Sequence, residues 1–159
     1  MREKEKKAVE KLMEILEREK ISADIIWHEE FGRESKEAAV FVKVTPDRIL
    51  KTLTFIRDDG KPVLVVITGD RKVDEKKLAN FLGSKARLAK ASEVREVTGY
   101  EVGGVPPFGA DIETVFDLEV LKKDVVLAPA GSPFAGMKIK PEDMLKLKKE
   151  AKKSDISAV

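Results

Sequence analysis

Two apolar segments joined by a short polar turn constrain the fold of this chain more than any other feature. Residues 49–57 and 62–68 are rich in Ile, Val, Leu, Thr and Phe, and Asp58-Asp59-Gly60-Lys61 separates them. An Asp-Gly pair between two such segments is typical of a hairpin turn. We therefore expect an antiparallel pair of strands.

The rest of the chain alternates between helical and strand patterns. Apolar spacing and capping residues predict helices over residues 3–20, 74–82, 92–98 and 141–153, with caps at Asp74 and at Ala91 or Ser92. Ser35 resembles another helix start, and Thr45-Pro46-Asp47 indicates a turn. Short apolar segments predict strands over residues 21–27, 113–116, 125–128 and 137–139. This irregular order favours an α+β fold with a mixed, largely antiparallel sheet over a doubly wound parallel sheet.

Length and composition exclude several chemistries. The 159 residues fit one domain, 1–159, which begins with the 1–20 helix and ends in a polar tail over residues 154–159. The absence of Cys excludes a thiol nucleophile, and His28, the single histidine, cannot form a histidine zinc centre. An all-carboxylate site is the one metal option left, and we expect neither a metal nor another cofactor.

Charge and apolar content bear on habitat and location. There are 31 Lys and Arg against 29 Asp and Glu, and Asn80 is the single side-chain amide, a composition typical of thermophile proteins. Residues 2–7 are mostly charged and lack the apolar core expected of a signal peptide, and no apolar segment reaches ~18 residues. We expect a soluble, cytoplasmic protein.

The loop over residues 99–109 is the first candidate site. Gly103 and Gly104 permit close approach of a ligand to the main chain, while Pro106 and Pro107 stiffen the segment. The N–H groups of Gly103, Gly104 and Val105 would then be free to hold a carbonyl oxygen or an oxyanion. The same composition also suits a tight structural turn.

Lys51 is the second candidate, because it begins the apolar sequence Lys-Thr-Leu-Thr-Phe-Ile near the start of the first predicted strand. Strict alternation places Lys51 on the same face as Leu53 and Phe55. An inward ammonium needs an anion or a polar pocket. The alternative is a lysine at the strand end that extends into water.

Three motifs together resemble a known family. The sequence Lys-Thr-Leu-Thr-Phe-Ile from Lys51, the Gly-x-x-x-Pro loop over residues 103–107 and Ala-Gly-Ser at 130–132 have the order and spacing of the YbaK/ProRS-associated aminoacyl-tRNA editing domain. The resemblance extends from about Ser35 to Leu145. It implies a sheet curled into a barrel-like core with surrounding helices.

The resemblance also implies a function: trans-acting hydrolysis of the ester in mischarged tRNA, such as Cys- or Ala-tRNA(Pro). Lys51 matches the family's functional lysine, which contacts the carbonyl or the terminal phosphate and ribose. The loop with Gly103, Gly104, Val105, Pro106 and Pro107 would orient the ester, and Ala130, Gly131 and Ser132 would form the pocket wall. A ribose hydroxyl, rather than a protein nucleophile, helps to activate water in this family. The expected partners are tRNA and, as a further candidate, an aminoacyl-tRNA synthetase.

Some features leave alternatives open. Alanine-directed members carry a His after Ala-Gly-Ser, whereas residues 133–135 here are Pro-Phe-Ala, so the amino acid removed stays undetermined. A non-catalytic module that binds the tRNA acceptor end or a synthetase would use the same pocket. His28 suits a strand end better than a general base, and Asp111 and Asp117 suit turns better than an ammonium site. The lysines in residues 138–153 indicate a locally basic helix that could face tRNA.

Overall fold

The computed structural model describes residues 3–27 and 45–159. His28 and the helix start predicted at Ser35 lie outside these residues. The described part is an α+β structure with three sheets and four α-helices: α1 (Glu3–Arg18), α3 (Glu75–Leu82), α4 (Ala91–Thr98) and α5 (Pro141–Leu147). None of these helices is long and apolar enough to span a membrane.

The largest sheet is built on the predicted hairpin, which is confirmed. Its strand order is β5 (Ala86–Leu88), β2 (Leu50–Arg57), β3 (Pro62–Thr68), β6 (Thr114–Asp117) and β9 (Lys152–Ser154). The β2 and β3 strands pair antiparallel, and the N–H of Gly60 donates to the carbonyl of Arg57 at 2.8 Å in the turn. The pairs on the other side, β3–β6 and β6–β9, are parallel. The β2–β5 pair is antiparallel, so this sheet is mixed, and antiparallel pairs outnumber parallel ones across the three described sheets, as predicted.

Two smaller sheets complete the strand arrangement, and no sheet closes into a barrel. One is β1 (Asp24–Trp27), β8 (Ala135–Ile139) and β7 (Val126–Pro129); the other is β10 (Ser157–Ala158) with β4 (Lys72–Val73). Among the described residues, a single parallel bridge between Ile49 and Leu127 connects the three-stranded sheet to the large one. The expected barrel-like core is therefore wrong. Two 3-10 helices, η1 (Pro46–Arg48) and η2 (Val120–Lys122), occupy connections, η1 at the predicted Thr-Pro-Asp turn.

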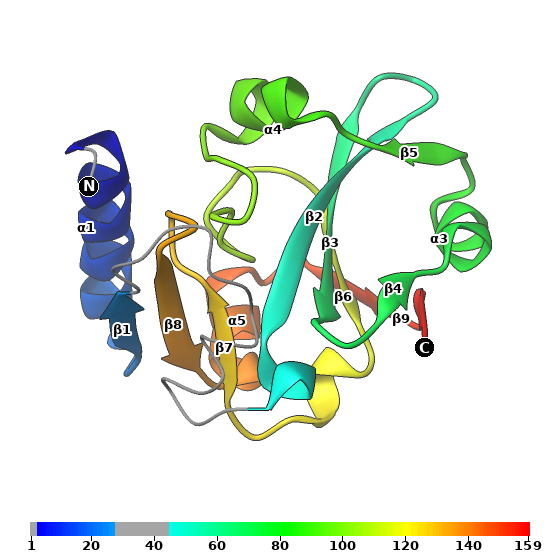
Figure 1. Ribbon diagram of the computed structural model, residues 1–159. Helices are drawn as coiled ribbons and strands as arrows, with labels where there is room; N and C mark the ends of the chain where they lie inside the picture. Colours follow the sequence, from blue (N-terminus) through cyan, green and yellow to red (C-terminus); the bar gives the residue numbers. More distant parts are fainter. Residues whose placement is uncertain (1–2, 28–44) are drawn as a thin grey trace.

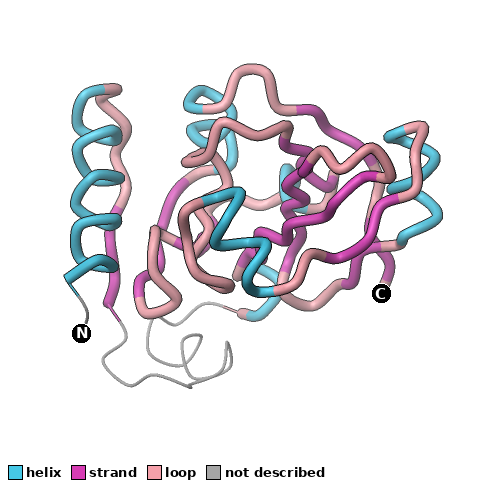
Figure 2. Tube along the Cα trace, turned by 90° about the horizontal axis from the view of Figure 1, so that it is seen from above, coloured by secondary structure: helices cyan, strands magenta, loops and turns pink. Residues whose placement is uncertain are grey.

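Helices cover the sheets from different sides (Figure 1). The predicted first helix is confirmed, and α1 buries Val9, Leu12 and Leu16 against the three-stranded sheet and the core beside it. Seen from above in Figure 2, α1 with β1 forms one edge of the molecule and α3 lies at the opposite edge. The predicted cap of α3 is also confirmed, since the Asp74 carboxylate accepts the N–H groups of Lys76 and Lys77 at 3.1 Å.

The large sheet has two buried faces, and the difference between them decides where the candidate residues lie. Paired residues of β2 and β3 share a face, so Phe55 and Val63 pack with Leu78 of α3. Leu64, on the other face, packs with Val105 of the glycine-proline loop. We call these the α3 face and the loop face.

The end of the chain differs from the prediction. The helix predicted to reach Lys153 ends at Leu147, and residues 152–154 form β9 beside β6. The expected polar tail is wrong as well, because Ile156 and Ser157 are buried. Pairing with β6 supplies backbone partners for an otherwise open sheet edge, and burial of Ile156 against the α3 face outweighs the helical tendency of the lysine-rich sequence.

Candidate functional site

The two glycine-containing loops lie main chain against main chain. The N–H of Gly131 donates to the carbonyl of Gly104 at 2.9 Å. A Cβ at Gly104 would lie 2.9 Å from Cα and the carbonyl carbon of Ser132. Gly103 has φ +86°, which favours glycine, and a Cβ there would lie 3.4 Å from Cβ of Pro133. The structure therefore brings together the Gly-x-x-x-Pro loop and the Ala-Gly-Ser turn.

The main-chain donors of the loop are fewer than expected. The N–H of Gly104 donates to the carbonyl of Glu101 at 2.9 Å and is therefore not free. Val105 is buried at 1% exposure in a cluster with Leu64 and Val94. Gly103 is exposed, and its N–H has no main-chain acceptor among the described residues. Of the three donors, Gly103 is the one at the surface.

Packing fixes the rest of the loop. Pro106, Pro107 and Phe108 are buried, so the prolines stiffen a segment that is part of the core. The loop ends at Ala110, whose carbonyl accepts the buried ammonium of Lys148 at 2.8 Å. Lys148 directly follows α5. The segment after α5, which is distant in sequence, therefore helps to hold the end of the loop in place. A rigid loop is the kind that can present a donor without reorganisation.

The Ala-Gly-Ser turn is also buried. Ala130 and Ser132 have no exposed surface, and the Oγ of Ser132 accepts the N–H of Phe134 at 3.1 Å. The other wall of the turn is α1, because a Cβ at Gly131 would lie 3.3 Å from the carbonyl oxygen of Ala8. These contacts show a Ser hydroxyl that is engaged in the turn itself.

A small hollow lies where α1 approaches the two loops. Its volume is about 40 Å³, which is enough to hold an ordered water molecule. Burial raises the pKa of the Tyr100 phenol in its wall, so that group stays neutral. The lining residues are Lys4, Glu5, Ala8, Gly99, Tyr100, Glu101 and Gly131.

Lys51 lies on the α3 face and not on the loop face. It is half-buried, and it pairs across the hairpin with Ile67, which packs with Phe55. The predicted alternation with Leu53 and Phe55 is therefore confirmed. The Nζ donates to the carbonyl of Arg71 at 3.2 Å, and no carboxylate within the described residues forms an ion pair with it. Lys51 therefore lies on the face opposite the one that packs against Val105 of the glycine-proline loop.

Two residues next to Lys51 were missed by the sequence interpretation. Thr52 and Thr54 are 8% and 3% exposed, and their hydroxyls have no hydrogen-bond partner within residues 3–27 and 45–159. Both lie on the loop face, paired with Val66 and Leu64. Strict alternation along β2 would have assigned them to this face, but it could not show that their hydroxyls lack partners.

The remaining charged candidates are the aspartates Asp111 and Asp117 and the lysines of residues 138–153. Asp117 is buried and accepts the N–H of Ile156 and the hydroxyl of Ser157, while Asp111 is exposed. Of the seven lysines in residues 138–153, α5 contains one, Lys146, so the expected basic helix is wrong. No cluster of three metal-binding side chains is found in the described part of the chain.

Comparisons with known proteins agree with the motifs. Residues 29–147 match the model of the aminoacyl-tRNA editing domain. The uncharacterised protein YwhH of Bacillus subtilis is 35% identical over 111 residues, which is 69% of this chain and 71% of YwhH. The proline–tRNA ligase of Moorella thermoacetica is 43% identical over 86 residues, which is 53% of this chain and 15% of the ligase. The chain therefore corresponds to a small part of that enzyme.

Solved structures share the whole arrangement. One, described as a candidate trans-editing enzyme for prolyl-tRNA synthetase, superposes with a TM-score of 0.86 and 28% identity, covering 96% of this chain and 98% of that one. A second, the hypothetical protein APE2540, has a TM-score of 0.85 and 30% identity, covering 93% and 99%.

Proposed function

Because the chain belongs to the aminoacyl-tRNA editing domain family, which is related to the editing domain of prolyl-tRNA synthetase, we propose that it is a trans-acting deacylase. It hydrolyses the ester that joins a wrong amino acid to the terminal ribose of a tRNA. The observation that carries this proposal is the similarity along 96% of the chain to a candidate trans-editing enzyme. The activity belongs in the cytoplasm, where tRNA is charged.

The proposed acceptor is tRNA(Pro), since the matched ligases are specific in name for proline. Alanine and cysteine are the two candidate amino acids. The residues Pro133, Phe134 and Ala135 stand where alanine-directed members carry a His, so cysteine is tested beside alanine.

The chemistry needs a water molecule, a donor for the oxyanion and a group that positions the substrate. Water attacks the ester carbonyl, the carbonyl oxygen becomes an oxyanion, and the ribose oxygen leaves with a proton. Gly103 supplies an exposed N–H for the oxyanion. The Ser132 hydroxyl is buried and engaged, which argues against a serine nucleophile and supports activation of water by the neighbouring ribose hydroxyl.

Lys51 and Gly103 act on different parts of the substrate in this proposal, because Lys51 lies on the sheet face opposite the one that packs against Val105 of the loop. An ammonium with one carbonyl acceptor and no carboxylate partner among the described residues keeps donors available for an oxyanion ligand. We assign Lys51 to the phosphate of the terminal nucleotide and Gly103 to the ester carbonyl. Substrate held at two points is positioned for attack by water.

The experiment is a panel of aminoacylated tRNAs. The purified chain is incubated with Ala-, Cys- and Pro-tRNA(Pro), and with Ala-tRNA(Ala) and Cys-tRNA(Cys), while release of the amino acid is followed. We expect faster release than in buffer for at least one mischarged tRNA(Pro) and no excess release of proline. Hydrolysis of every substrate at the buffer rate would reject the proposal. Binding without hydrolysis would favour the alternative, a module that binds the acceptor end or a synthetase.

A further inference from the structure

The environment of Lys51 points to residues that act through it. Its ammonium can donate three hydrogen bonds, and the structure gives it one acceptor among the described residues, the carbonyl of Arg71. That carbonyl is therefore the group within the described residues that orients the ammonium. The contacts that hold Arg71 in place therefore also influence the position of the Lys51 ammonium.

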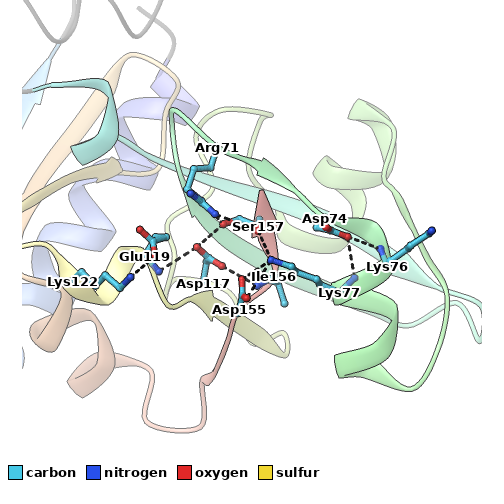
Figure 3. Close-up of polar contacts among 10 residues, drawn as sticks. All are labelled: Arg71, Asp74, Lys76, Lys77, Asp117, Glu119, Lys122, Asp155, Ile156 and Ser157. Atoms are coloured by element: carbon cyan, nitrogen blue, oxygen red, sulfur yellow. Dashed lines mark hydrogen bonds and ion pairs between the residues drawn. The ribbon is translucent and has the colours of Figure 1, made fainter. Parts of the chain in front are cut away.

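Arg71 is held at both its main chain and its side chain. Its N–H donates to the carbonyl of Thr68 at 3.1 Å in the turn that follows β3. Its guanidinium reaches Ser157, with Nε 2.6 Å from the hydroxyl and Nη2 3.4 Å from the carbonyl oxygen (Figure 3). These contacts tie the turn to a strand that lies 86 residues further along the chain.

Ser157 is fixed in turn by a buried carboxylate. The Ser157 hydroxyl donates to Asp117 at 2.7 Å, and Asp117 also accepts the N–H groups of Ile156 at 2.9 Å and Glu119 at 3.2 Å. Asp117 is 1% exposed and Ser157 has no exposed surface. A carboxylate with three donors and no access to water is a rigid support. We call Asp117, Ser157 and Arg71 the clasp.

The clasp ends at the ammonium assigned to the substrate. Ordinary anchoring of residues 155–158 is already provided by the β10–β4 pairing, by the N–H of Asp74 on the Ile156 carbonyl and by Lys77 on Asp155. The guanidinium of Arg71 adds a connection from this anchored segment to the turn that contacts Lys51.

We propose that the clasp positions the Lys51 ammonium for substrate, so that Arg71, Ser157 and Asp117 are positioning residues of the deacylase. The proposal rests on the proposed function for its catalytic consequence. It predicts that loss of the clasp disorders the ammonium and lowers turnover through Lys51 and not through general loss of structure.

The test combines a double-mutant cycle with a direct measurement on Lys51. Arg71→Met removes the guanidinium and keeps the main-chain carbonyl. We expect it to lower kcat/KM for the best mischarged tRNA about tenfold, since a misplacement of ~1 Å can cost ~10²-fold. In a Lys51→Ala background the same substitution should change kcat/KM less than about twofold. Equal losses in both backgrounds would overturn the proposal.

The direct measurement is the NMR order parameter of the Lys51 ammonium nitrogen, which does not depend on activity. The order parameter should fall in Arg71→Met and in Ser157→Ala. Ser157→Ala also serves as the test variant if Arg71→Met does not fold. The control is Arg87→Met, which removes an exposed ion pair with Glu93 on another part of the surface and should alter neither readout. An unchanged order parameter in both clasp variants overturns the proposal. An ordered ammonium that depends on the clasp, in a chain that hydrolyses no tRNA, rejects the proposed function and leaves the positioning of Lys51 established.

Discussion

Gly104 and Ser132 meet through their main chains, so close together that a Cβ at Gly104 would lie 2.9 Å from Cα of Ser132. The contact joins two loops separated by 27 residues of intervening chain, residues 105–131. It gives Gly104 a structural role that is independent of any substrate. The exposed donor of the loop is its neighbour, Gly103.

Gly104→Ala should therefore destabilise the fold. The new methyl group meets main-chain atoms of Ser132 that cannot move aside by rotating, so we expect a loss of about 1–3 kcal/mol in the free energy of unfolding. Urea denaturation measures it. Val102→Ala, an exposed position in the same loop, serves as the control and should leave stability within about 0.5 kcal/mol. Equal stability of the two variants would contradict the close contact.

Thr54→Val should stabilise the protein by about 1 kcal/mol. The Thr54 hydroxyl is buried and has no partner in the described part of the chain, and the substitution replaces it with a methyl group of similar size. Thr114→Val is the matched control, because the equally buried Thr114 hydroxyl donates to the Ile112 carbonyl at 2.9 Å. That variant should lose about 1 kcal/mol. Thermal or urea unfolding that ranks the two variants in the opposite order would refute the assignment.

Ile156→Ala tests the placement of the last strand. Ile156 has no exposed surface and packs on the α3 face, so truncation should cost about 2–5 kcal/mol. Val159→Ala, at a side chain that is 98% exposed, should change stability by less than about 0.5 kcal/mol. If both substitutions were neutral, the chain end would be the polar tail expected from its composition.

The Glu93 carboxylate should contribute to stability only above acid pH. The pKa of Glu93 is lowered from 4.5 to about 2. The hydrogen bond from Arg87 is the largest cause, and the hydrogen bond from the Lys90 N–H is the second. A lowered folded-state pKa means that this stabilisation is complete above pH 4.5 and is lost as pH falls towards 2. An NMR titration of the Glu93 carboxyl carbon measures the pKa, and Arg87→Met should move it back towards 4.5. A midpoint near 4.5 in the unmodified protein would rule out the pairing.

Sequence reasoning succeeded where structure is encoded locally. The hairpin turn, the Asp74 cap and the alternation of Lys51 with Leu53 depend on residues within a few positions of one another. The helix predicted over residues 92–98 is also present, but it begins at Ala91 and its N-cap is Lys90, not Ala91 or Ser92; the Glu93 carboxylate accepts the N–H of Lys90. These features could be predicted because the turn and the cap form their hydrogen bonds between residues that are close in the sequence.

The failures involve partners far apart in the sequence. Residues 152–154 carry a helical pattern, and only the open edge of β6 makes them a strand. The motifs place Lys51, Gly103 and Ser132 in one family pattern, but Lys51 lies on the sheet face opposite the one that packs against Val105 of the loop. The alternation of apolar residues shows which side chains share a face of a strand. It does not show which of the two faces packs against a distant loop, because that depends on the connections between strands.

Deacylation of the best mischarged tRNA(Pro) by the parent chain and by Lys51→Ala tests the central claim most directly. Loss of one electrostatic contact in a preorganised site should slow hydrolysis by ~10²–10³. Lys51→Arg should recover only part of the rate, because a planar guanidinium replaces a compact ammonium. The melting temperature should change little, since Lys51 is half-buried and makes one hydrogen bond within the described residues. Hydrolysis by folded Lys51→Ala at the parent rate would contradict the account.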